Sequence, residues 1–242
     1  PAPPVPPHVL ILSGILMMSV AGASVSLWQY WTSTKRKWFL FGAFVWFVGV
    51  VLKIIWGQFL SAPILGWLID NLPAQLFLFV GSLYIGVLTG IFEIGITALL
   101  AIFWKESYEK FDRAVAVGIG AGATEAYLIG AFVLFLGPVI SQSHICNTPF
   151  LWLVGPVERV IAILCHAASR AFVLLALRTG ERKHFWTAFW LMTLLDAVAG
   201  FFHLSGYVDE ISPWLMECAL VPFAIASCIL IDRCRSLWPE EA

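Results

Sequence analysis

Four ionisable residues lie deep within long apolar segments of this sequence: Glu93, Glu125, His166 and Asp196. A charged side chain at the centre of a bilayer costs roughly 2.5–3.5 kcal/mol, so such residues need partners and usually have a task. Carboxylates and an imidazole can act as general bases, as metal ligands or as proton carriers. We take Glu125, His166 and Asp196, together with Glu93, as the candidate catalytic residues.

Three interpretations of this group stay open. In the first, it is a structural network in which a carboxylate pairs with His166 or Arg159. In the second, a buried carboxylate is a general base that activates a water for attack on a peptide bond. The third is a transport or proton path, which also uses midplane acids and histidines. His203 follows Asp196 by seven residues and is expected near the outer interface, as an interfacial residue rather than a ligand.

The segment 155–178, GPVERVIAILCHAASRAFVLLALR, is the helix that must position several of these groups. Arg159, His166 and Arg170 are spaced i, i+7 and i+11, which is one face of a helix at 3.6 residues per turn. We expect Glu158, Arg159 and Arg170 to form a structural polar network along it.

The composition predicts an all-α membrane protein. Of the 242 residues, 60% are hydrophobic and 12% are charged, and the mean hydropathy is +0.89. Soluble domains average about 25% charged residues. A net charge of −1 gives no indication of nucleic-acid binding. Five cysteines without a C-x-x-C pair indicate neither a disulfide framework nor a zinc ribbon.

The apolar pattern predicts one polytopic helix bundle, residues 1–242, with about seven transmembrane helices of roughly 20 residues or more. A Pro-rich extended leader is expected at 1–8 and a cytoplasmic tail at 232–242. Pro63, Gly66 and Pro73 break residues 58–75, which are expected to be interfacial or re-entrant. Lys53 would then lie near a helix end, where it can snorkel to the interface. The expected spans are 9–31, 38–57, 76–104, 114–137, 150–178, 185–204 and 213–231.

Basic residues predict the orientation. Of the 14 Lys and Arg residues, 11 fall in the tail and in the loops after the first, third and fifth spans. The positive-inside rule places that face in the cytoplasm, with the N-terminus outside and the C-terminus inside. Within the fourth span, Gly118 and Gly122 form a G-x-x-x-G pair, which lets helices in lipid pack closely.

Five segments, in order, resemble the YhfC family of intramembrane metalloproteases, which is related to the CAAX-prenyl-protease-like, or glutamic intramembrane protease, group. The resemblance runs from the second span onward and implies an intramembrane-protease-like fold in a multi-pass protein of a prokaryotic plasma membrane. The matching segments are Trp38–Leu52, Gly90–Gly95 (GIFEIG), Gly118–Ala126 (GIGAGATEA), Glu158–His166 (ERVIAILCH) and MTLLDAVAG around Asp196.

The sequence departs from the family pattern at four positions. Ile94 replaces the second acid of a Glu-Glu pair, Thr97 replaces an Arg, and Ala121 and Met192 replace histidines. A catalytic metal site needs about three protein ligands and an open position for water, so losing two imidazoles damages it. Losing the second Glu damages a glutamic mechanism too.

The resemblance and its departures together predict a degenerate protease without a metal or other cofactor. We expect a non-catalytic subunit or scaffold that lies in the lipid bilayer, binds another membrane protein and has no nucleic-acid partner. The alternative is an active peptidase using Glu125 as base and His166 as oxyanion donor or metal ligand, with Asp196 beside them. Zinc is expected only under that alternative.

Overall fold

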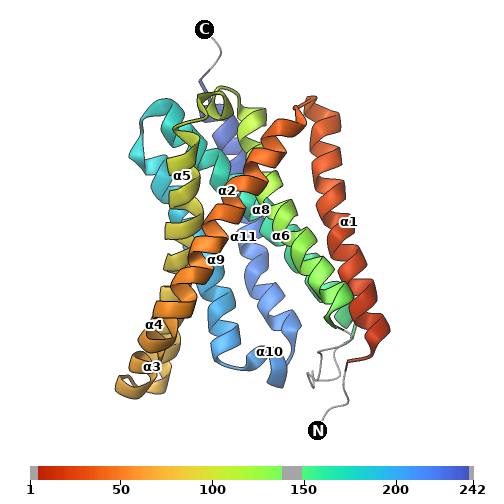
Figure 1. The fold of residues 1–242 in the computed structure, drawn as a ribbon, viewed down its shortest axis with the longest axis vertical. Helices are drawn as coiled ribbons and strands as arrows, with labels where there is room; N and C mark the ends of the chain where they lie inside the picture. Colours follow the sequence, from red (N-terminus) through yellow and green to blue (C-terminus); the bar gives the residue numbers. More distant parts are fainter. Residues whose placement is uncertain (1–4, 138–148, 240–242) are drawn as a thin grey trace.

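The computed structural model describes residues 5–137 and 149–239. It is an all-helical bundle, without strands in the described residues (Figure 1). Seven helical stretches of the described chain are long and apolar enough to cross a membrane, which confirms the predicted fold class. These stretches are Pro7–Thr32, Arg36–Asn71, Ala74–Ala101, Phe111–Phe135, Leu151–Thr179, Arg182–Leu204 and Pro213–Leu237.

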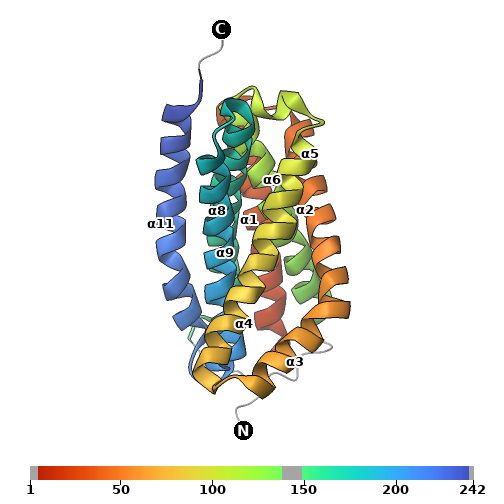
Figure 2. The same ribbon diagram turned by 90° about the vertical axis from the view of Figure 1, so that its left-hand side faces the viewer.

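The bundle is built around α8 (Leu151–Thr179). In its most apolar stretch 78% of the residues are buried, against 22% in α1 (Pro7–Thr32) and in α11 (Pro213–Leu237). Helices α6 (Phe111–Phe135) and α9 (Arg182–Leu204) pack beside it, and α11 stands at the edge of the bundle (Figure 2). A short helix, α10 (Tyr207–Glu210), joins α9 to α11. The helix that carries most of the ionisable candidates is therefore the one most shielded from lipid.

The second span is longer than the sequence indicated. Helix α2 (Arg36–Trp56) continues through the π-helical turn η1 (Gly57–Ser61) into α3 (Ala62–Asn71). Pro63 does not break the helix, because it occupies the first turn of α3, where a missing backbone N–H is tolerated and the wider π turn precedes it. The chain leaves the helix at Leu72, whose extended backbone is that of a residue before proline.

The third span is also one continuous helical stretch with an irregular centre. Helix α4 (Ala74–Thr89) passes into the π turn η2 (Gly90–Gly95) and then into α5 (Ile96–Ala101). A short 3-10 turn, η3 (Lys105–Tyr108), connects it to α6. Turns of the π type are frequent at functional sites because they redirect side chains.

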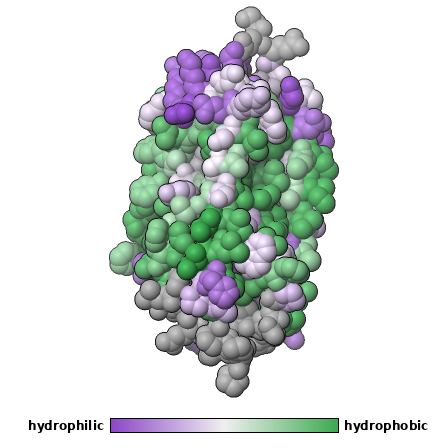
Figure 3. Space-filling view, turned by 90° about the vertical axis from the view of Figure 1, so that its right-hand side faces the viewer, coloured by the Kyte–Doolittle hydropathy of each residue, from purple (hydrophilic) through white to green (hydrophobic). Residues whose placement is uncertain are grey.

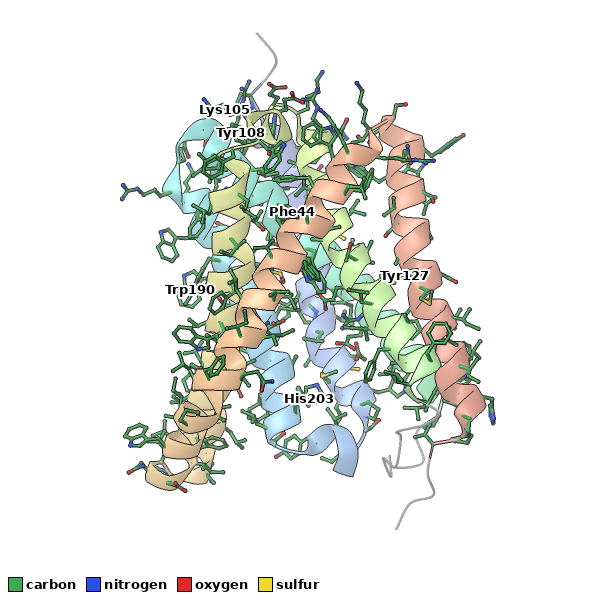
Figure 4. The ribbon with its side chains drawn as sticks, in the orientation of Figure 1. Phe44, Lys105, Tyr108, Tyr127, Trp190 and His203 are labelled. Carbon is green, nitrogen blue, oxygen red and sulfur yellow. The ribbon has the colours of Figure 1, made fainter. Side chains whose placement is uncertain are left out.

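The surface separates into an apolar middle and a basic end. Figure 3 shows hydrophobic residues covering the middle of one face and hydrophilic residues gathered at its upper end. The loops that carry the basic residues lie at this end, as Lys105 does in Figure 4, whereas His203 is exposed at the opposite end of α9. Which end faces the cytoplasm stays a prediction.

The ends of the chain differ in detail from the expected boundaries. Helix α1 begins at Pro7, inside the expected leader, and α11 continues to Leu237, inside the expected tail. Residues 1–4 of the leader, Cys146 and residues 240–242 of the tail lie outside the described residues.

Candidate functional site

Glu93 is presented by the π turn η2 of the third span. The GIFEIG segment is this turn, and Glu93 is buried within it. Thr97, one turn later, donates its hydroxyl hydrogen bond to the Glu93 carbonyl oxygen at 2.6 Å. The Thr97 hydroxyl thus satisfies a backbone carbonyl of the wider π turn. The Glu93 carboxylate points into the bundle.

Glu125 and His166 contact each other between α6 and α8. His166 Nε2 lies 2.8 Å from Glu125 Oε2. Arg159 Nη1 donates to Glu125 Oε1 at 2.5 Å, and the Trp46 indole N–H donates to Oε2 at 3.1 Å. Arg159 also pairs with Glu158, its neighbour in α8. Both oxygens of Glu125 are therefore held by donors from α2 and α8.

A second ion pair joins α8 to the π turn. Arg170 is fully buried, and its Nη2 donates to Glu93 Oε2 at 2.8 Å. Lys53 Nζ approaches the other oxygen, Oε1, at 3.6 Å. The His166 Nδ1 atom is 4.0 Å from Glu93 Oε2 and has no hydrogen-bond partner among the described residues. Glu93 therefore has a cation at each oxygen, whereas Glu125 has a permanent cation, Arg159, at Oε1 only.

Asp196 joins the cluster through Lys53 rather than through His166. Lys53 Nζ donates to Asp196 Oδ2 at 3.2 Å and to the Thr89 hydroxyl at 2.5 Å. Thr89 in turn donates to Asp196 Oδ2. The network therefore runs from α8 across α6, the π turn and α2 to α9.

Most of these side chains line one cavity of about 380 Å³, although Arg170 and Thr89 do not. Its lining comes from α2, α6, α8, α9, α11 and the π turn η2. Figure 1 shows α2 and α6 diverging toward the lower end of the bundle. Ile54 and Ile129 line the cavity and are exposed at 56% and 38%, so the cavity reaches the apolar surface of the bundle. Its ionisable lining residues are Lys53, Glu93, Glu125, Glu158, Arg159, His166 and Asp196.

Three members of this network were missed from the sequence. Lys53 was expected to snorkel to an interface, but its amine lies in the cavity between Asp196 and Glu93. The error follows from ending the second span near Gly57, because the helix continues to Asn71 and leaves Lys53 far from its end. Trp46 and Thr89 are uncharged residues of apolar helices, so nothing in the sequence distinguished them as site residues.

The glycine pair of α6 lies against α8 at the level of the site. A Cβ atom on Gly118 would lie 2.4 Å from the backbone oxygen of His166, and one on Gly122 would lie 2.9 Å from the Ile163 Cα. Only glycine permits this approach. The close packing holds Glu125, on the same helix, within hydrogen-bond distance of His166.

A metal ion at this site would have to compete with the arginines that already pair with the two glutamates. One possible ligand atom from each of Glu93, Glu125 and His166 lies within 4.8 Å of the others, so distance alone would allow an ion. The His166 imidazole lies between the two carboxylates, with Nε2 2.8 Å from Glu125 Oε2 and Nδ1 4.0 Å from Glu93 Oε2. Catalytic zinc sites generally have more nitrogen or sulfur ligands than this one imidazole. Cations already occupy both glutamates.

A model of the YhfC intramembrane metalloprotease family matches residues 15–142, more than half of the chain. The chain belongs to this family. Searches of the curated proteins and of the solved structures find no match. The family match includes Glu93 and Glu125, whereas His166 and Asp196 lie beyond it.

Of the positions that depart from the expected family pattern, one lines the cavity and the others are buried away from it. Met192 lines the cavity, one turn before Asp196, so a histidine there would add an imidazole to the cavity wall. Ile94 and Ala121 are fully buried and do not line it. Thr97, the position where an arginine is expected, is buried and donates to the Glu93 carbonyl oxygen, while Arg170 from α8 pairs with the Glu93 carboxylate.

Proposed function

We propose that this protein is a catalytically degenerate member of its family that binds another membrane protein. The observation that carries the proposal is the pairing of the two midplane glutamates. Arg159 and Trp46 hold Glu125, and Arg170 and Lys53 hold Glu93.

A general base must accept a proton from a water placed within hydrogen-bond distance of it. Both oxygens of Glu125 already have partners, so a water activated there would have to share the carboxylate with Arg159, Trp46 and His166. Such a network instead joins α2, α6, α8 and α9 through charges that membrane burial makes costly to separate.

The exposed residues at the edge of the Glu125 cavity support the proposal that the protein binds another membrane protein. Ile54 and Ile129 form an exposed apolar edge between α2 and α6, where a transmembrane segment of a partner could pack. In the same proposal, the basic end faces the cytoplasm of a prokaryotic plasma membrane and the N-terminus lies outside. A C-terminal alkaline phosphatase fusion is then expected to be inactive, since that enzyme folds only outside the cytoplasm.

Site-specific photocrosslinking in the native membrane tests the binding role. A crosslinking amino acid at Ile54 or Ile129 is expected to give one adduct of defined polypeptide mass. Leu40 and Ile229 are matched controls, because both are exposed apolar residues that do not line the cavity. Equal adducts at all four positions, or lipid adducts alone, would contradict the proposal.

One observation favours a second candidate, an active peptidase. Glu125 and His166 are 2.8 Å apart in a cavity, and His166 Nδ1 has no partner among the residues described. Under this alternative, Glu125 is the base and the imidazole donates to the developing oxyanion. Cleavage of a transmembrane peptide, lost in both Glu125→Ala and His166→Ala, would establish it.

A further inference from the structure

A second cavity lies at the basic end, between the first turns of α9 and the last turns of α11. Its volume is about 340 Å³. Its polar lining is Lys183, His184 and Thr187 on α9 and Arg233 on α11. Its apolar lining comes from α8 and α11 and consists of Phe172, Leu230 and Leu237. It is separate from the Glu125 cavity and shares no lining residue with it.

The N-terminal turn of α9 gives this cavity an excess of positive charge. Helix N-termini carry partial positive charge and favour acidic residues, but the first turn of α9 has none and begins with Arg182 and Lys183. No side chain caps this end. The helix end and its side chains thus both favour a bound anion.

The Glu181 carboxylate neutralises only part of this positive charge. Glu181 contacts Lys183 at 2.5 Å and lies 3.2 Å from His184 Nε2. The hydrogen bond from Lys183 lowers the pKa of Glu181, which is therefore ionised at neutral pH. Arg233, on the other side of the cavity, forms no ion pair within residues 5–137 and 149–239.

The apolar lining indicates the kind of anion. The Phe172 ring packs on the His184 ring with centroids 5.8 Å apart, which makes the inner wall of the cavity hydrophobic. The cavity lies at the ends of two membrane spans, at the level expected of lipid headgroups. Trp186 and Ile229, on the same two helices, are exposed at 50% and 63%. Anionic headgroups bind basic pockets of this kind between transmembrane helices.

We propose that the cavity between the first turns of α9 and the last turns of α11 binds the headgroup of an anionic phospholipid. The lipid phosphate lies between Lys183 and Arg233 at the N-terminus of α9. One acyl chain follows the apolar surface between α9 and α11, which are neighbouring helices. Helix α11 stands at the left edge of the bundle in Figure 2.

The test uses the full chain, purified in a neutral detergent and stripped of lipid. Native mass spectrometry and the thermal unfolding midpoint are measured with phosphatidylglycerol, with phosphatidylcholine of the same acyl chains, and with inorganic phosphate. Phosphatidylglycerol is expected to stay bound and to raise the midpoint, and the other two are not. Equal effects of phosphatidylcholine, or of inorganic phosphate, would overturn the assignment of an anionic lipid.

Matched variants separate this cavity from the general basic surface. Lys183→Ala/Arg233→Ala is expected to bind phosphatidylglycerol roughly tenfold to thirtyfold more weakly, from the contribution of two basic residues near a membrane surface. Arg36→Ala/Arg235→Ala removes the same charge at the same end, but neither residue lines the cavity. An equal loss in this control would mean diffuse attraction and would overturn the proposal.

Two further variants test whether the loss of binding reflects the basic charge itself, and whether the anion lies at the N-terminus of α9. The charge-conserving pair Lys183→Arg/Arg233→Lys is expected to retain binding, and Glu181→Gln is expected to tighten it, because it removes the competing carboxylate. Weaker binding in Glu181→Gln would contradict the placement of the anion at the N-terminus of α9. None of these residues lines the Glu125 cavity, so the result is independent of the proposed function.

Discussion

Removing Arg170 is the most informative perturbation of the midplane network. Arg170 is fully buried, and its main partner, Glu93, is 5% exposed. Removing one partner of a buried ion pair costs about 3–5 kcal/mol, since the other charge stays buried. Lys53, 3.6 Å from the second Glu93 oxygen, still stabilises the negative charge of Glu93 in part when Arg170 is removed. We therefore expect Arg170→Met to lower the free energy of unfolding by about 3 kcal/mol, the lower end of this range.

A double-mutant cycle isolates the pair. Glu93→Gln leaves Arg170 without its carboxylate and is expected to cost a similar free energy. The double variant Arg170→Met/Glu93→Gln removes both charges and is expected to cost less than either single change, with a coupling energy of about 3 kcal/mol. Unfolding can be followed in mixed micelles through the fluorescence of the 12 tryptophans.

The exposed pair Lys37–Glu106 is the control for this cycle. Its atoms are 2.5 Å apart, but its side chains are 55% and 60% exposed. Lys37→Ala is expected to leave the unfolding transition unchanged, because exposed pairs contribute little. Additive effects of Arg170→Met and Glu93→Gln, within about 0.5 kcal/mol, would refute the claim that these residues form one buried unit.

Two further predictions concern packing and an unpaired acid. A Cβ on Gly42 would lie 1.9 Å from the backbone oxygen of Val117, so Gly42→Ala is expected to prevent close packing of α2 on α6. Gly22→Ala, with nothing within 4 Å, should be neutral or stabilising, and an equal loss of folded yield in both would contradict this reasoning. Glu217 is buried and neither carboxylate oxygen has a partner in the described chain, so Glu217→Gln is expected to preserve or raise stability. A destabilisation of Glu217→Gln as large as that of Glu93→Gln would show that the carboxylate has an essential partner.

The helical architecture could be predicted from the sequence because bilayer spans leave a strong apolar signal. The seven spans are confirmed. The break expected at Pro63 does not occur, because a proline in the first turn of a helix is tolerated. The shared face of Arg159, His166 and Arg170 follows from helical periodicity alone, since all three lie on one helix.

The pairing of side chains between helices could not be predicted in the same way. Arg170 and Glu93 are 77 residues apart, and nothing local links them. Lys53 was misplaced because its role depends on where its helix ends. The π turn at Gly90–Gly95 directs Glu93 inward, and regular helical periodicity does not indicate such a turn.

Metal content and peptidase activity of the purified protein test the central claim most directly. The full chain is purified in detergent with zinc supplied, beside Glu125→Ala and His166→Ala, and incubated with transmembrane peptides. If cations hold both glutamates, all three proteins carry only substoichiometric metal and show no cleavage above background. One zinc ion per chain that is lost in His166→Ala, or cleavage that is lost in both variants, would contradict the account.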